Sequence, residues 1–164
     1  MELKQKLLII DQGAIGDLIL SLPAFAAIRK AFQGHSLEIL GYRRTLNLIH
    51  KRFYADSVSS IDRASCAQLY QDDGIEAPEL LEYLAPFATI IVFGGRRQEI
   101  LVRNISRATA AQVFRIPPFP GSAGVHVVDF QLEHLRRCGI KPGGAVPELF
   151  LSDADMARAG SFLR

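Results

Sequence analysis

Residues 6–17 read KLLIIDQGAIGD and decide how the chain folds. After the lysine, four aliphatic residues follow one another, which is typical of a strand buried on both faces of a parallel sheet. Gly13 and Gly16 then allow a tight turn. Apolar residues recur at spacings of three and four over residues 18–32, which predicts a helix. Pro23 interrupts this pattern, so the helix is either kinked there or regular only from that residue onward.

The same alternation of strands and helices continues along the chain. Short aliphatic runs predict strands at 36–41, 57–61, 88–93 and 112–116. Helical spacing predicts helices at 43–53, at 80–84, from 96 toward 107, and at 126–137. This order predicts the α/β class, with a Rossmann-like, doubly wound and mainly parallel sheet. In such a sheet the ligand crevice lies at the carboxyl ends of the strands, where residues 11–17, 41–44 and 94–97 fall.

Length, charge and cysteine content narrow the class of protein. The 164 residues are enough for one domain with a real core, and the formal net charge of +2 is too small to favour nucleic acid as a partner. Neither Cys66 nor Cys138 has a companion at metal-ligand spacing, so we expect no metal site. The apolar start is too short for a signal peptide and no run reaches the roughly 20 residues of a membrane span. We therefore expect a cytoplasmic protein with reduced thiols.

The end of the chain predicts a second unit. Residues 152–155 have the pattern of a capping box with Asp in the acidic position, and they open a helix that has barely begun at Arg164. We therefore expect a domain over residues 1–151, followed over 152–164 by the start of an interdomain linker or helix.

The turn at Gly13 to Asp17 carries two interpretations. The pattern Asp-x-Gly-x-x-Gly-Asp is close to the dinucleotide fingerprint, but Asp11 replaces its first glycine. Two carboxylates at the turn would repel a pyrophosphate, while Arg43 and Arg44 after the second strand would suit NADP, so an NADP-binding oxidoreductase domain stays open. Asp17 is either an acid that stabilises its helix start or a base aimed into the crevice.

A resemblance to a known family bears on this choice. Residues 8–10, the run Gly13 to Ala24 and residues 28–32 resemble the opening of the lipopolysaccharide heptosyltransferases of glycosyltransferase family 9. The strand at 89–93 and the stretch 126–140 are similar to later parts of that family. The resemblance covers this chain and about half of a typical member. Residues 11–14 depart from the family, which often has a basic residue and Ser or Thr there, and the strand at Thr89 lacks its frequent aspartate.

The resemblance implies an inverting glycosyltransferase of the two-domain GT-B architecture, with this chain as the amino-terminal, acceptor-binding half. Asp17 matches the family's catalytic base for the acceptor hydroxyl. The implied donor is an ADP-sugar such as ADP-heptose, bound by a carboxyl-terminal domain that this chain lacks, and the acceptor is a lipopolysaccharide core or related glycan. No cofactor or metal is implied, and the chain alone is expected to be inactive.

Two arginine pairs are the remaining candidates for binding. Arg43 with Arg44, and Arg96 with Arg97, follow strands and could bind carboxylates or phosphates of a glycan or glycolipid acceptor. Either pair could equally be solvated surface. Arg44 with the basic residues at 51–52 could instead meet anionic lipid at the inner face of the inner membrane. A non-catalytic module that binds anionic glycans through these edges is a third possible function.

Overall fold

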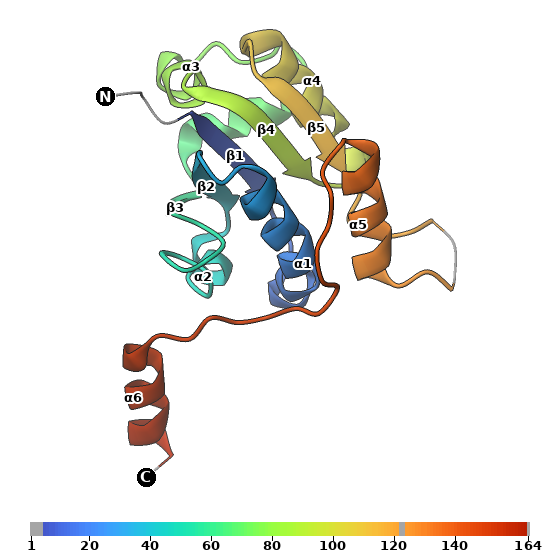
Figure 1. Cartoon of the computed structure of the whole chain (residues 1–164). Coiled ribbons are helices and arrows are strands. Elements are labelled where there is room, and N and C mark those ends of the chain that lie inside the picture. Colours follow the sequence, from blue (N-terminus) through green and yellow to red (C-terminus); the bar gives the residue numbers. More distant parts are fainter. Residues whose placement is uncertain (1–4, 122–123, 164) are drawn as a thin grey trace.

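The computed structural model describes residues 5–121 and 124–163 and contains one five-stranded parallel sheet. The strand order is β3-β2-β1-β4-β5, with β1 in the centre (Figure 1). The strands are β1 Lys6–Asp11, β2 Ser36–Gly41, β3 Ser57–Ser60, β4 Phe87–Phe93 and β5 Gln112–Ile116. All neighbouring strands pair in parallel, so the predicted Rossmann-like, doubly wound α/β sheet is confirmed.

Helices connect successive strands. The α-helices are α1 Ile15–Ala31, α2 Arg43–Leu46, α3 Pro78–Leu84, α4 Glu99–Ala108, α5 Val127–Arg137 and α6 Asp153–Phe162. Two short 3₁₀ helices, η1 Ala64–Tyr70 and η2 Arg96–Gln98, complete the set. Helix η1 was not predicted, because its only buried residues are Cys66 and Leu69, too few to give a period.

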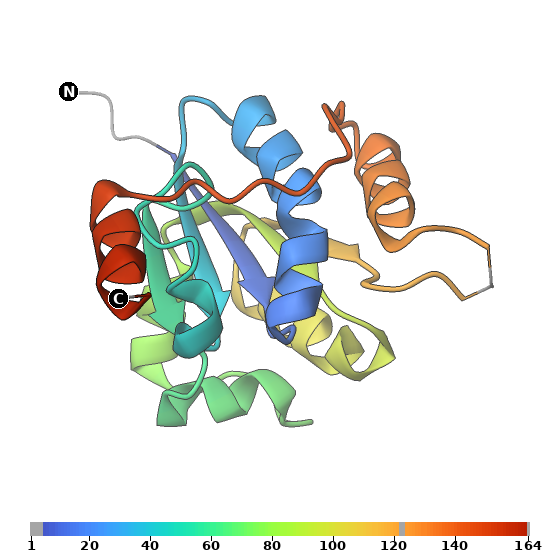
Figure 2. The same cartoon turned by 90° about the horizontal axis from the view of Figure 1, so that it is seen from below.

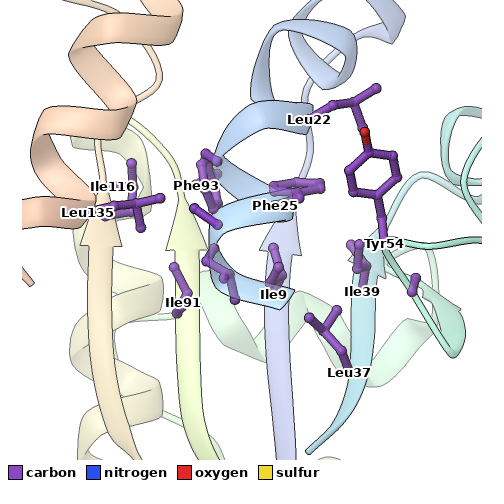
Figure 3. Packing of buried hydrophobic residues seen from close by; sticks show 14 of the residues in the cluster. Ile9, Leu22, Phe25, Leu37, Ile39, Tyr54, Ile91, Phe93, Ile116 and Leu135 are labelled. Carbon is purple, nitrogen blue, oxygen red and sulfur yellow. The ribbon is translucent and has the colours of Figure 1, made fainter. Parts of the chain in front are cut away.

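The central strand shows why the sheet needs two covering layers. Leu7 and Ile9 belong to one hydrophobic cluster, together with residues of α1 and α5, and Figure 3 shows part of this packing. Leu8 and Ile10 point to the opposite face and join residues of η1, α3 and α4. The layers are visible in Figure 2, where α1 and α5 lie on one side of the sheet and α3 and α4 on the other. A strand buried on both faces has no polar alternation, as its sequence indicated.

Helix α1 runs as one helix from Ile15 through Pro23 to Ala31. The alternative that regular helix begins only near Pro23 is therefore wrong. Pro23 removes one backbone donor, but it is buried, and the burial of its ring offsets part of the cost of the lost hydrogen bond.

The predicted helix at 43–53 is also wrong beyond its first turn. Helix α2 ends at Leu46, and the chain reverses through Lys51, whose φ of 53° lies in the left-handed region. Phe53 and Tyr54 follow this turn and pack against Phe150, about a hundred residues later. The apolar spacing thus reflects a long-range contact instead of a helix face.

The segment after α5 crosses the α1 side of the sheet (Figure 2). It ends in α6, which stands away from the body in Figure 1. The Tyr54 hydroxyl donates to the Glu148 carbonyl at 2.6 Å, which fastens the segment midway. The predicted capping box is confirmed, since Ser152 Oγ accepts from the Asp155 amide and Asp155 accepts from the Ser152 amide. Arg52 also pairs with Asp155 at 2.6 Å.

Candidate functional site

The strand order creates a natural crevice between β1 and β4. After β1 the chain moves outward through β2 and β3, then crosses back to β4 on the other side of β1. The loops that leave the carboxyl ends of β1 and β4 therefore turn in opposite directions, and ligands of doubly wound sheets bind at this switch point.

A cavity of about 360 Å³ opens at this point. It is lined by the end of β1 and the start of α1, by the turn after β4, and by the loop after β5. Its lining residues are Asp11, Gln12, Gly13, Asp17, Ser21, Phe93, Gly94, Gly95, Arg96, Arg97, Gln98, Pro118 and Phe119. The structure thus brings Gly13 and Asp17 together with Arg96 and Arg97, although these pairs are some eighty residues apart in sequence.

The turn from β1 into α1 is held by Asp17. Ala14 is the N-cap of α1, and its methyl side chain cannot accept a hydrogen bond. The Asp17 carboxyl instead supplies the reciprocal half of a capping box, because it accepts from the Ala14 amide at 3.2 Å. This contact fixes the carboxylate at the positive end of the helix and beside the cavity. The two interpretations of Asp17, helix stabiliser and base, are therefore compatible in one position.

Gly13 and Gly16 have different environments. A β-carbon on Gly13 would lie 2.8 Å from the Asp17 Cβ and 3.1 Å from Asp11 Oδ1, so only glycine fits there. Gly16 is exposed in the first turn of α1, outside the cavity lining, and a β-carbon on it would meet nothing within 4 Å. Gly13 is required by packing, whereas Gly16 leaves open surface beside Asp17.

Asp11 is a site residue that the sequence interpretation did not assign. It is only 6% exposed, and its Oδ1 accepts from the Gly13 amide at 2.8 Å. Burial raises the pKa of its carboxyl from 3.8 to about 6; the Gly13 amide lowers the pKa and the charge of Asp17 raises it. Oδ2 is buried and has no hydrogen-bond partner among the residues that the structure describes.

The turn after β4 supplies the positive side of the cavity. Gly94 is required by packing, because a β-carbon on it would lie 2.6 Å from the Gln98 Cγ. Gly95 then leads into η2, which carries the exposed side chains of Arg96 and Arg97. Within residues 5–121 and 124–163, neither guanidinium pairs with a carboxylate. Both are therefore available to an anionic group of a ligand.

Arg43 and Arg44 lie elsewhere. They follow β2 and line a separate hollow of about 330 Å³ with Tyr42 and Asp62, which shares no lining residue with the cavity. The structure therefore places the two arginine pairs at separate hollows. Nor do Arg44, Lys51 and Arg52 share a helix face, since α2 ends at Leu46.

Sequence reasoning also missed Ser21 and Phe119 as lining residues. Ser21 is one α1 turn beyond Asp17 and is buried beneath the cavity, a position that helical spacing from Asp17 could have indicated. Phe119 is 52% exposed and follows two prolines, and no sequence pattern predicts that its loop reaches the β1 turn.

Among residues 5–121 and 124–163, no group of three or more His, Cys, Asp and Glu side chains is arranged to hold a metal ion. In that same part of the chain, no helix is long and apolar enough to cross a membrane.

Comparison with known proteins identifies structural neighbours but no sequence relatives. No protein-family model matches the chain, and no curated protein matches it in sequence. A glycosyl transferase family 9 structure from Veillonella parvula matches with a TM-score of 0.68 at 15% identity, covering 99% of this chain and 50% of that one. E. coli heptosyltransferase WaaC with ADP-2-deoxy-2-fluoro heptose matches with a TM-score of 0.56 at 14% identity, covering 87% and 51%.

The same heptosyltransferase with ADP matches with a TM-score of 0.54 at 14% identity, covering 93% of this chain and 52% of that one. At these identities the comparison shows a shared fold. The chain spans about half the length of each of these structures. This proportion agrees with the expected half of a two-domain GT-B architecture.

Proposed function

We propose that this chain is the acceptor-binding half of an inverting glycosyltransferase, with Asp17 as its catalytic base. The observation that carries the proposal is the position of Asp17 at the switch-point cavity, in a fold shared with half of a family 9 glycosyltransferase. The proposed donor is an ADP-sugar, ADP-heptose in the first instance, and the proposed acceptor is a lipopolysaccharide core or related glycan.

In the proposed reaction, the Asp17 carboxylate takes the proton of an acceptor hydroxyl. The hydroxyl oxygen forms a bond to the anomeric carbon of the donor as the bond from that carbon to the diphosphate oxygen breaks. ADP leaves with the bonding electron pair, and the anomeric configuration inverts. The chain's contribution is to orient the acceptor and hold the base, because positioning supplies much of the rate in such a displacement.

The charge distribution supports an acceptor at this cavity more than a nucleotide. Asp11 and Asp17 flank Gly13 on the β1 side, where a pyrophosphate would meet two carboxyls. In the NADP alternative, Arg43 or Arg44 would have to contact the cofactor, yet they line the other hollow. Arg96 and Arg97 are proposed to bind anionic groups of the acceptor across the cavity.

The test uses the natural full-length protein, with ADP-heptose and an oligosaccharide obtained by deacylating heptose-deficient lipopolysaccharide. We expect Asp17→Asn to lower kcat by about a hundredfold or more, since general base catalysis contributes roughly that factor. Asp62→Asn, which changes a carboxylate of the other hollow, is the matched control and should leave kcat unchanged. Wild-type activity in Asp17→Asn would exclude Asp17 as the base.

Binding experiments on the 164-residue chain test whether it binds the acceptor and not the donor, and they also test the alternative functions. We expect it to bind the oligosaccharide and to show no strong binding of ADP or of NADP. Micromolar NADP binding that Arg43→Glu abolishes would establish the oxidoreductase alternative. Oligosaccharide binding without transfer by the full-length protein, unaffected by Asp17→Asn, would establish a non-catalytic glycan-binding module.

A further inference from the structure

Asp11 is a buried carboxyl at the cavity that has no role in the proposed reaction. Its side chain lies at the carboxyl end of β1 and is only 6% exposed. Oδ1 accepts from the Gly13 amide, and the buried Oδ2 has no hydrogen-bond partner among the described residues. An orphaned carboxyl oxygen costs free energy in a protein interior, so its presence at a cavity calls for an explanation.

The two carboxyls of the turn accept from two successive backbone amides, one on either side of the Gly13 α-carbon. The Gly13 amide donates to Asp11 at 2.8 Å, and the next amide, that of Ala14, donates to Asp17 at 3.2 Å. The two side chains also approach one point, because a β-carbon on Gly13 would lie 3.1 Å from Asp11 Oδ1 and 3.7 Å from the Asp17 Cγ. The Gly13 α-carbon joins these two peptide units, so a shift of the first unit displaces the Ala14 amide that holds the Asp17 carboxyl.

We propose that Asp11 is a positioning residue for Asp17, which it holds in place through the Gly13 amide. The inference rests on the proposed function, because the position of the Asp17 carboxyl matters for catalysis only if Asp17 is the base. Asp11 fixes the peptide between residues 12 and 13 from the buried side. The next peptide, between residues 13 and 14, supplies the Ala14 amide that holds the Asp17 carboxyl. Without Asp11, the Gly13 amide loses its acceptor and the turn gains freedom, since glycine restricts it least.

The electrostatics of the pair agree with this arrangement. The pKa of Asp11 is raised to about 6 chiefly by burial, and the nearby Asp17 adds to the rise. The other charged groups that line the cavity are Arg96 and Arg97 on η2, and both are exposed to solvent. Oδ1 can accept from the Gly13 amide in the neutral and in the ionised carboxyl, so the positioning contact survives titration of Asp11.

The first test is structural and needs no substrate. In the isotope-labelled 164-residue chain, NMR of the Asp11 carboxyl carbon should give a titration midpoint near 6. Asp17→Asn should lower that midpoint, because it removes a neighbouring negative charge, whereas Asp62→Asn should leave it unchanged. An Asp11 midpoint that does not respond to Asp17→Asn would overturn the apposition on which the proposal depends.

The second test uses the full-length protein with ADP-heptose and the deacylated oligosaccharide. Asp11→Ala should lower kcat by about tenfold to a hundredfold with KM little changed, because the base is misplaced and the ligand contacts remain. Asp11→Asn keeps an acceptor for the Gly13 amide and should restore most of kcat. Wild-type kcat in Asp11→Ala, or equal losses in both variants, would overturn the inference while the Asp17 result stands. If Asp17→Asn is fully active, the proposed function itself fails.

Discussion

Gly13 is packed so closely against Asp17 that a β-carbon built on it would lie 2.8 Å from the Asp17 Cβ. Real β-carbons do not approach so closely, so a side chain at residue 13 must displace the turn or the first turn of α1. We therefore expect Gly13→Ala to lower the free energy of unfolding by about 1–3 kcal/mol, the usual cost of overpacking. Urea denaturation of the 164-residue chain measures this change.

Gly16→Ala is the matched control, and it separates packing from function. A β-carbon on Gly16 meets nothing within 4 Å, and alanine is favoured over glycine inside a helix by roughly 0.5–1 kcal/mol. The variant should therefore be as stable as wild type or slightly more stable. If the open surface at Gly16 admits the acceptor, the full-length variant should have a raised KM for the oligosaccharide despite its intact fold.

Replacing Asp11 should change how stability depends on pH. The pKa of Asp11 is about 6 in the folded chain against 3.8 for an ordinary aspartate, so the folded state holds its proton more tightly. The stabilisation from this group is complete below about pH 4 and is lost as the pH rises through about 6. A shift of this size corresponds to about 3 kcal/mol as an upper bound.

Asp11→Asn cannot ionise, so this loss should be absent from it. Relative to wild type, the unfolding free energy of Asp11→Asn should therefore increase by up to about 3 kcal/mol as the pH rises from about 4 to about 7. Urea denaturation at a series of pH values checks this slope. Parallel pH curves for the two proteins would mean that the Asp11 carboxyl is ionised as easily as in the unfolded chain.

Phe150 is one of the residues that hold the segment crossing the α1 side. Its ring lies 5.1 Å from that of Phe53 and 5.5 Å from that of Tyr54, and it is 37% exposed. We expect Phe150→Ala to cost about 1–2 kcal/mol, a part of the ~3–5 kcal/mol typical of a fully buried phenylalanine. Proteolysis between α5 and α6 should also become faster.

Leu151→Ala is the control for this segment. Leu151 is 60% exposed, so its removal should change the unfolding free energy by less than about 0.5 kcal/mol. Equal effects of the two substitutions would show that the Phe150 ring does not hold the segment in solution.

The parts of the fold that could be predicted are those that depend on local patterns. All five strands were predicted within one residue at either end. Strands β1 and β4 have the continuous apolar sequence of a strand buried on both faces. The prediction of a helix at 43–53 was wrong beyond its first turn, because the aromatic rings of Phe53 and Tyr54 pack against Phe150 and not along a helix face. A local pattern cannot distinguish a helix face from a distant partner.

The candidate site shows the same division. The switch-point position of residues 11–17 and 94–97 follows from strand order and could be predicted. The burial of Asp11 could not, because a polar residue at a strand end is solvated in most turns, and only packing against its neighbours leaves it 6% exposed. The separation of Arg43 from the cavity likewise depends on which side of β1 each strand lies.

The two arginine pairs give a direct test of which basic surface binds the acceptor. The double variant Arg96→Glu, Arg97→Glu reverses the only positive charges among the described lining residues of the cavity. Since a hydrogen bond to a charged group is worth about 1.5–3 kcal/mol, the oligosaccharide should bind the 164-residue chain at least about tenfold more weakly. Isothermal titration calorimetry with the deacylated oligosaccharide measures this loss.

The double variant Arg43→Glu, Arg44→Glu makes the same change of charge in the separate hollow, so any effect of net charge alone appears equally in both. We expect it to leave oligosaccharide affinity unchanged. Sedimentation with vesicles containing anionic lipid then tests the second role of this pair, because a surface that meets lipid headgroups should lose vesicle binding on charge reversal. A loss of oligosaccharide affinity confined to Arg43→Glu, Arg44→Glu would move the acceptor to the hollow beside β2 and away from Asp17.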